Sequence, residues 1–176
     1  MSGTTRPHRT LLAAAVAAGV LSAASALGQE PAGPVVRPLD RGARTLLEEA
    51  RHLSPTVESE IATLVGRHVI VYLSSMPVSQ CRTGRLSLVG VVGATRYLLI
   101  EIPLAQGTLD RCMWLGHELQ HAIEIGSSDV SDAASLERFY RRTGRLLPRL
   151  EETFETDAAM DIGRRVRVEV SRALQR

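Results

Sequence analysis

The residues best suited to chemistry are two histidines and a glutamate in the sequence HELQH at positions 117–121. Apolar spacing predicts a helix over 108–125 that contains this stretch. A spacing of four residues places both histidines on one helix face, one turn apart, where their ring nitrogens can converge on a single ion. The glutamate between them can act as a general base toward a metal-held water. The pattern therefore predicts His117 and His121 as metal ligands and Glu118 as catalytic base; the alternative is an amphipathic helix with two surface histidines.

A catalytic zinc of this kind needs a third protein ligand, with water in the fourth position. In the extended pattern H-E-x-x-H-x-x-G-x-x-H, which marks metzincins, the additional Gly and His would stand at positions 124 and 127. The chain has Glu124 and Ser127 there, so that class is excluded. The remaining source of a ligand is a carboxylate from a later helix.

Glu155 is the strongest candidate for that ligand. A final helix is expected from about Arg149 to Leu174, and at 100° per residue Glu155 lies at the centre of its apolar face. A carboxylate on a buried face is costly unless it is paired or bound to a metal. Glu151, one turn earlier and about 40° away at that same rotation per residue, is the second candidate. The alternative for Glu155 is a helix-start glutamate favoured by the helix dipole.

HELQH, followed by the sequence ETDA at 155–158, resembles the minimal gluzincin zinc metallopeptidases, often called minigluzincins. The resemblance covers roughly residues 96–167. It implies one catalytic Zn²⁺ bound by His117, His121 and Glu155, with Glu118 as general base and proton shuttle. It also implies a peptide or protein substrate.

Other features of the family pattern are only partly present. Ala158 and Ala159 stand where many gluzincins carry a supporting aspartate. The strand 97–102 is similar in order to the zincin edge strand, which pairs with an extended substrate by β-augmentation. Tyr140 and Arg138 are the candidates for stabilising a developing oxyanion, but neither belongs to a motif, and a tyrosine in such a place is more often a packing aromatic. Two rival functions therefore stay open: a non-catalytic interaction protein, with or without zinc, and a zinc amidase or esterase that is not a peptidase.

The elements that must position these residues follow from periodicity and from breaker residues. The apolar spacing predicts helices over 39–53 and 55–65, then a β-branched strand over 68–73. A hairpin is expected from strands 85–92 and 96–102, and Pro103 favours an edge position for its second strand. Helices over 108–125, 131–143 and 149–174 follow. The order predicts an α+β, zincin-like fold, in which a small antiparallel sheet is accompanied by an active-site helix and flanking helices.

The amino-acid composition excludes several kinds of binding site and partner. The chain has 176 residues, with 21 basic side chains against 19 acidic ones, and every basic one is arginine. The absence of lysine excludes a Schiff-base lysine and a P-loop lysine. Aromatic residues make up only 3% of the chain, which argues against a base-stacking surface for nucleic acid.

The N-terminal residues 1–26 have the features of a secretory signal peptide. Arg6 and Arg9 precede the apolar run 11–21, and small residues lead to a cleavage site after Ala26. A flexible leader is expected over 27–38 and a single metalloprotease domain over 39–176. Cleavage removes two arginines and no acidic residue, so the remaining chain is electrically balanced. We expect a periplasmic or secreted protein with no membrane partner after cleavage, and leave its oligomeric state open.

Cys81 and Cys112 are the only two cysteines. An even number of cysteines in an exported chain favours a disulfide between them. Two buried thiols are the alternative. A bond between these residues would tie the helix that carries HELQH to the loop after the first strand.

Overall fold

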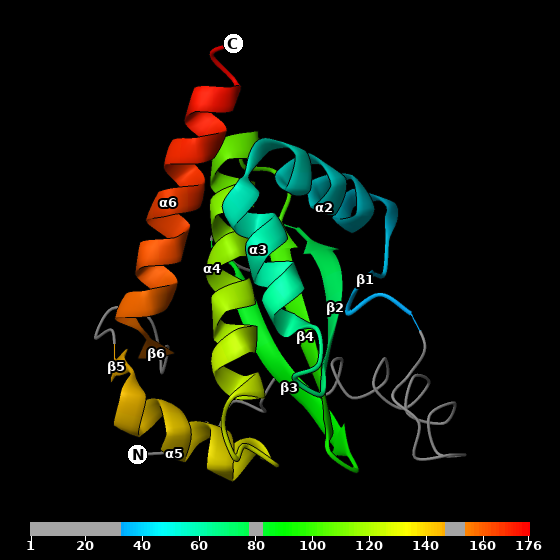
Figure 1. Cartoon of the computed structure of the whole chain (residues 1–176), viewed down its shortest axis with the longest axis vertical. Coiled ribbons are helices and arrows are strands. Elements are labelled where there is room, and N and C mark those ends of the chain that lie inside the picture. Colours follow the sequence, from blue (N-terminus) through cyan, green and yellow to red (C-terminus); the bar gives the residue numbers. More distant parts are fainter. Residues whose placement is uncertain (1–32, 78–82, 147–153) are drawn as a thin grey trace, which may run out of the picture. The chain divides into compact units, whose positions relative to one another are not determined.

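The computed structural model describes residues 33–77, 83–146 and 154–176. Their helices and strands establish an α+β protein, as the sequence predicts, and Figure 1 shows their arrangement. In chain order the elements are β1 (Val36–Pro38), α2 (Arg41–Leu53), α3 (Pro55–Leu64), β2 (Val69–Met76), β3 (Arg85–Val92), β4 (Thr95–Pro103), α4 (Thr108–Gly126), α5 (Ala133–Thr143), β5 (Arg145–Leu146), β6 (Phe154–Glu155) and α6 (Asp157–Ala173).

The main sheet is mixed, so the expectation of an antiparallel sheet is wrong. Its strand order is β1-β2-β4-β3. β1 pairs with β2 in parallel, and so does β2 with β4, while β3 and β4 form the expected antiparallel hairpin. The helices α2 and α3 lie between β1 and β2 in the chain and supply the long crossover that a parallel pair needs. The hairpin instead turns at Gly93, whose φ of 59° lies in the left-handed region.

The edge position expected for the second hairpin strand is also wrong. β4 lies inside the sheet, paired on both sides, and β3 is the edge strand. Pro103 is tolerated because it is the last residue of β4, opposite Met76 at the end of the register. A proline at a strand end interrupts little of the hydrogen-bond ladder that a central proline would break.

The core lies between the sheet and α4. Leu98 and Ile100 of β4 are fully buried, as are Leu115 and Leu119 of α4. On its other flank α4 runs beside α6 (Figure 1), and Gly116 allows the close approach. A Cβ atom on Gly116 would lie only 2.6 Å from Cγ2 of Val166. The helix that carries HELQH is thus packed on both sides.

The last helix begins later than its apolar stripe predicts. Thr156 is the N-cap of α6, and its side chain accepts a hydrogen bond from the N–H of Ala159. A threonine cap of this kind ends the extended backbone before the helix begins. Phe154 and Glu155 therefore form the short strand β6, which pairs with β5.

The N-terminal expectations fall mostly outside the described residues. Residues 1–26 and most of the leader lie there. The strand β1, however, includes residues 36–38, which the sequence analysis counts with the leader. Within the described ranges, no helix combines the length and the hydropathy that crossing a membrane requires.

Candidate metal centre

His117 and His121 lie on one face of α4, as the spacing predicts. Both are buried, each with 5% of its surface exposed. Their rings meet edge to face with centroids 4.8 Å apart. Because the histidines belong to a helix packed between the sheet and α6, their backbone positions are fixed by the core.

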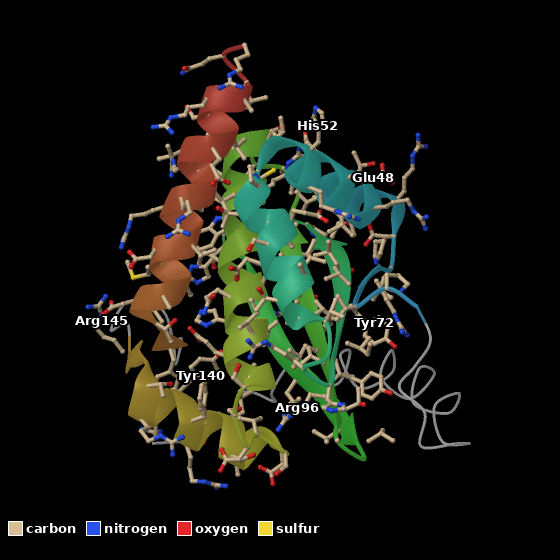
Figure 2. All side chains as sticks on the ribbon, in the orientation of Figure 1. Glu48, His52, Tyr72, Arg96, Tyr140 and Arg145 are labelled. Atoms are coloured by element: carbon tan, nitrogen blue, oxygen red, sulfur yellow. The ribbon has the colours of Figure 1, made fainter. Side chains whose placement is uncertain are left out.

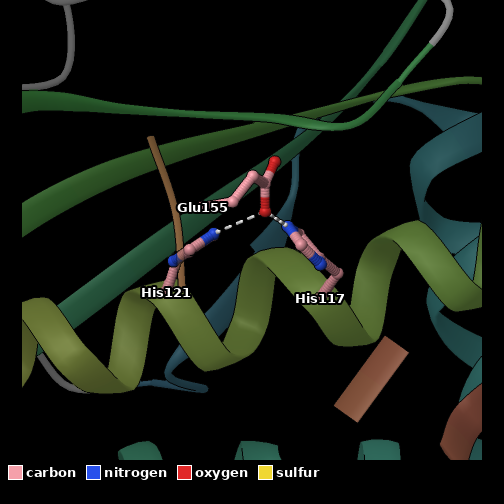
Figure 3. A group of neighbouring side chains, drawn as sticks. All are labelled: His117, His121 and Glu155. Carbon is pink, nitrogen blue, oxygen red and sulfur yellow. Dashed lines mark ion pairs between the residues drawn. The ribbon is translucent and has the colours of Figure 1, made fainter. Parts of the chain in front are cut away.

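Glu155 joins the two histidines from a different element. Its Oε2 atom lies 2.8 Å from Nε2 of His117 and 3.7 Å from Nε2 of His121, as Figure 3 shows. One ligand atom from each of the three residues lies within 4.8 Å of the others. The apolar face of the last helix was the wrong basis for choosing Glu155, because this residue precedes α6 and does not lie on that face.

The arrangement of these atoms fits a metal ion. Oε2 of Glu155 is buried and, among the described residues, its contacts with the two imidazoles do not have the geometry of a hydrogen bond. Ligands bound tetrahedrally at about 2.0–2.1 Å from zinc stand roughly 3.3 Å apart, between the two observed nitrogen–oxygen distances. Two imidazoles and a carboxylate suit Zn²⁺ and also other divalent transition metals.

Charge interactions explain the ionisation of Glu155. Burial acts to raise the pKa of its carboxyl, but the interactions with His117 and His121 outweigh burial and lower the pKa to about 2. Glu155 is therefore a carboxylate at neutral pH. At these nitrogen–oxygen distances, either a proton or a metal ion can lie between the carboxylate and the imidazoles.

Glu124 contacts the ring nitrogen of His121 that faces away from Glu155, a role that the sequence did not predict. Oε2 of Glu124 lies 3.0 Å from Nδ1 of His121, and Oε1 accepts a hydrogen bond of 2.7 Å from the Thr156 hydroxyl. Burial acts to lower the pKa of His121, but Glu124 and Glu155 outweigh it and raise the pKa to about 9. The signal available in the sequence was spacing, since a side chain three residues after His121 lies on the same helix face.

His117 is held by packing instead. The indole of Trp114 meets its ring edge to face, with centroids 5.5 Å apart. Gly163 of α6 lies on the other side, and a Cβ atom there would be 3.7 Å from Nδ1 of His117. Among the described residues, no hydrogen bond to this nitrogen is found.

Glu118 is buried beside the candidate ligands, with its side chain toward the start of β3. A Cβ atom on Gly84 would lie 2.8 Å from Oε1 of Glu118, so the glycine leaves room for the carboxylate. Burial raises the pKa of Glu118; His121 and His117 oppose the shift, and Glu155 adds to it. A carboxyl with a raised pKa is suited to accepting and releasing a proton.

Tyr140 reaches the site from α5 (Figure 2). Its ring lies 5.4 Å from that of His121 and stacks on Phe154. Burial raises the pKa of its phenol, and the charges of Glu124, Glu118 and Glu155 raise it further. Tyr140 therefore keeps its proton at neutral pH and can donate a hydrogen bond. Arg138, the other oxyanion candidate, is exposed.

Two candidate residues lie outside the described ranges: Glu151, the second candidate ligand, and Cys81. Cys112 is a buried thiol of α4, and burial raises its pKa to about 12. The disulfide between the two cysteines stays a prediction.

Comparison with known proteins adds no relative from which a function can be transferred. No family model matches this chain, and neither a curated protein nor a solved structure matches it. The function is therefore argued from the geometry of the site.

Proposed function

We propose that the protein is a zinc-dependent hydrolase, most specifically a metallopeptidase of the gluzincin kind. The observation that carries the proposal is the convergence of three buried ligand atoms, Nε2 of His117, Nε2 of His121 and Oε2 of Glu155. Glu118 supports it because a buried carboxyl lies on the same helix, next to both histidines.

When bound, zinc supplies Lewis acidity, which lowers the pKa of water and polarises a carbonyl group. Glu118 accepts a proton from the water that attacks the carbonyl carbon of the scissile amide. It then passes that proton to the leaving nitrogen. Its burial favours the protonated form that must exist between these two steps.

Tyr140 is the proposed donor to the carbonyl oxygen. Negative charge develops on this oxygen as water adds, and a protonated phenol at its side stabilises that charge. The edge-to-face contact with His121 and the stack on Phe154 fix the ring of Tyr140 at the site. Arg138 is a weaker candidate because its side chain is exposed on α5.

The strand that pairs with an extended substrate is β3 in this proposal and not residues 97–102. β3 is the edge strand, and it begins directly after Gly84, which contacts Glu118. Its outer edge pairs with no strand of the described residues and offers backbone hydrogen bonds to a peptide, which is the general basis of β-augmentation. A peptide paired there would run past Glu118.

The localisation of the protein is proposed from its sequence alone. We infer export by the signal peptide over 1–26, followed by action in the periplasm or outside the cell. The apolar run with its preceding arginines and small-residue cleavage site supports export.

Substitution of the proposed base tests the mechanism. Glu118→Gln keeps the size of the side chain and removes its basicity, so hydrolysis of a mixed peptide library should fall by at least about 100-fold while bound zinc is retained. The matched control is Glu48→Gln, an exposed glutamate of α2 far along the chain from the site (Figure 2). Full turnover in the Glu118 variant would contradict the mechanism. Zinc binding without hydrolysis of peptides, other amides or esters would favour the non-catalytic alternative.

A further inference from the structure

Glu124 contacts two parts of the chain that the metal centre must keep in register. One carboxylate oxygen faces Nδ1 of His121 at 3.0 Å, within α4. The other oxygen accepts a hydrogen bond of 2.7 Å from the hydroxyl of Thr156, which lies at the junction between β6 and α6. Thr156 directly follows Glu155 in the chain, so a single carboxylate is linked to two of the three candidate ligands.

Thr156 is itself tightly constrained. It is buried, and its hydroxyl oxygen also accepts the N–H of Ala159 at 3.1 Å as the N-cap of α6. The hydroxyl thus donates to Glu124 and accepts from the first turn of the helix, which uses its hydrogen-bonding capacity in both directions. The peptide that carries Glu155 is held between α4 and the start of α6.

We propose that Glu124 is a positioning residue that sets the orientation of the His121 imidazole and the place of Glu155 together. The inference rests on the proposed metal centre. A carboxylate facing Nδ1 keeps the ring proton on that nitrogen, which leaves the lone pair of Nε2 directed at the ion. Through Thr156 the same carboxylate fixes the backbone beside Glu155.

The geometry of both oxygens supports this role. Oε2 of Glu124 faces Nδ1 of His121, and Oε1 accepts a hydrogen bond from the Thr156 hydroxyl. The supporting aspartates that many gluzincins carry are replaced here by Ala158 and Ala159, and Glu124 supplies a carboxylate from the helix of HELQH instead.

Glu124→Gln keeps the shape of the side chain but replaces one of its two acceptor oxygens with an NH₂ group. An amide has only one acceptor oxygen, and because His121 and Thr156 face different oxygens of Glu124, the amide in this orientation can accept from one of them but not from both. If its NH₂ group faces Nδ1, the proton of His121 must move to Nε2, where it blocks ligation. Either arrangement disturbs one of the two contacts.

The experiment measures zinc affinity by competition with a chromophoric chelator, and the visible spectrum of the cobalt-substituted protein. We expect Glu124→Gln to weaken zinc binding by about 10–100-fold and to change the cobalt spectrum. Thr156→Val should cause a smaller loss, and Thr156→Ser, which keeps the hydroxyl, should restore binding. Gln120→Ala is the control, because among the described residues the Gln120 side chain makes only a long hydrogen bond, 3.5 Å to Oε1 of Glu124. Thermal unfolding of each chelator-treated variant reports whether the fold persists.

Three outcomes separate this proposal from the proposed function. Weaker binding in Glu124→Gln, with unchanged binding in Gln120→Ala, supports the positioning role even if the wild type hydrolyses nothing. Wild-type affinity and an unchanged cobalt spectrum in Glu124→Gln overturn the role and leave the hydrolase proposal standing. A wild type that binds no zinc overturns both.

Discussion

The two histidines of the site lie one helical turn apart but are held by different means. A charged network holds His121, in which Glu124 faces its Nδ1 atom and Thr156 holds Glu124. Aromatic and helix–helix packing holds His117, between Trp114 and Gly163. Hydrogen bonds to a carboxylate depend on ionisation, whereas packing depends on volume. The His121 half should therefore respond to pH and charge, and the His117 half to side-chain size.

Removing either imidazole is expected to give the largest effect, and an equal one, because both histidines are proposed ligands however they are held. His117→Ala and His121→Ala should each weaken zinc binding by at least about 1,000-fold, or about 4 kcal/mol, since one of three protein ligands is lost. Chelator competition measures this, with His52→Ala on the exposed face of α2 as control (Figure 2). Wild-type affinity in either variant would remove that histidine from the site.

Alkaline pH should destabilise the chelator-treated protein through His121. Its pKa is raised to about 9 in the fold, so the stability from its protonated form is present below about 6.5 and is lost as pH rises to 9. Glu60, whose pKa burial raises to about 7, loses its own stabilisation as pH rises from about 4.5 to 7, so the interval from pH 7 to 9 is the informative one. We expect a fall on the order of 2–3 kcal/mol in the free energy of unfolding across that interval.

Urea denaturation at pH 7, 8 and 9 measures this fall. His121→Gln is the control, and its free energy of unfolding should change much less over the same interval. At the acid end, Glu155 acts in the opposite sense. Its pKa is lowered to about 2, so its stabilisation is lost as pH falls below about 4.5. A wild-type protein equally stable at pH 7 and 9 would contradict the claim that charge interactions hold His121.

The size of the side chain packed against His117 should affect zinc binding. Gly163→Ala places a methyl group 3.5 Å from Cβ of His117, which is an ordinary contact. It should raise the free energy of unfolding by about 1 kcal/mol through helix propensity and leave zinc affinity unchanged. Gly163→Leu overfills the same space, at a cost of about 1–3 kcal/mol, and should weaken zinc binding by displacing the ring. Equal zinc affinity in the two variants would show that packing does not position His117.

Local patterns made much of this site predictable from sequence. The helix of HELQH, the shared face of its histidines and the Gly93 hairpin each depend on residues close together in the chain. The pairing of β2 with β4 depends on segments far apart, and alternation along a strand does not reveal which neighbours it takes. The edge position given to residues 97–102 was wrong for that reason.

Glu155 lies beside both histidines, but the helix-face argument that predicted its place was wrong. The apolar stripe beyond it continues in phase into α6, but periodicity does not locate the first residue of a helix. Thr156 does so, because its side chain caps the helix at Ala159. Glu124 was missed because its identity was used only to exclude one family pattern, and its reach to His121 was not considered.

The most direct test of the central claim is the zinc content of the purified protein beside Glu155→Ala and Glu151→Ala. Both variants remove a carboxylate from the same stretch of chain, so they differ only in which candidate ligand is lost. We predict one zinc per chain in the wild type and in Glu151→Ala, and little or none in Glu155→Ala. Zinc retained in Glu155→Ala and lost in Glu151→Ala would contradict this prediction, as would a wild type without zinc.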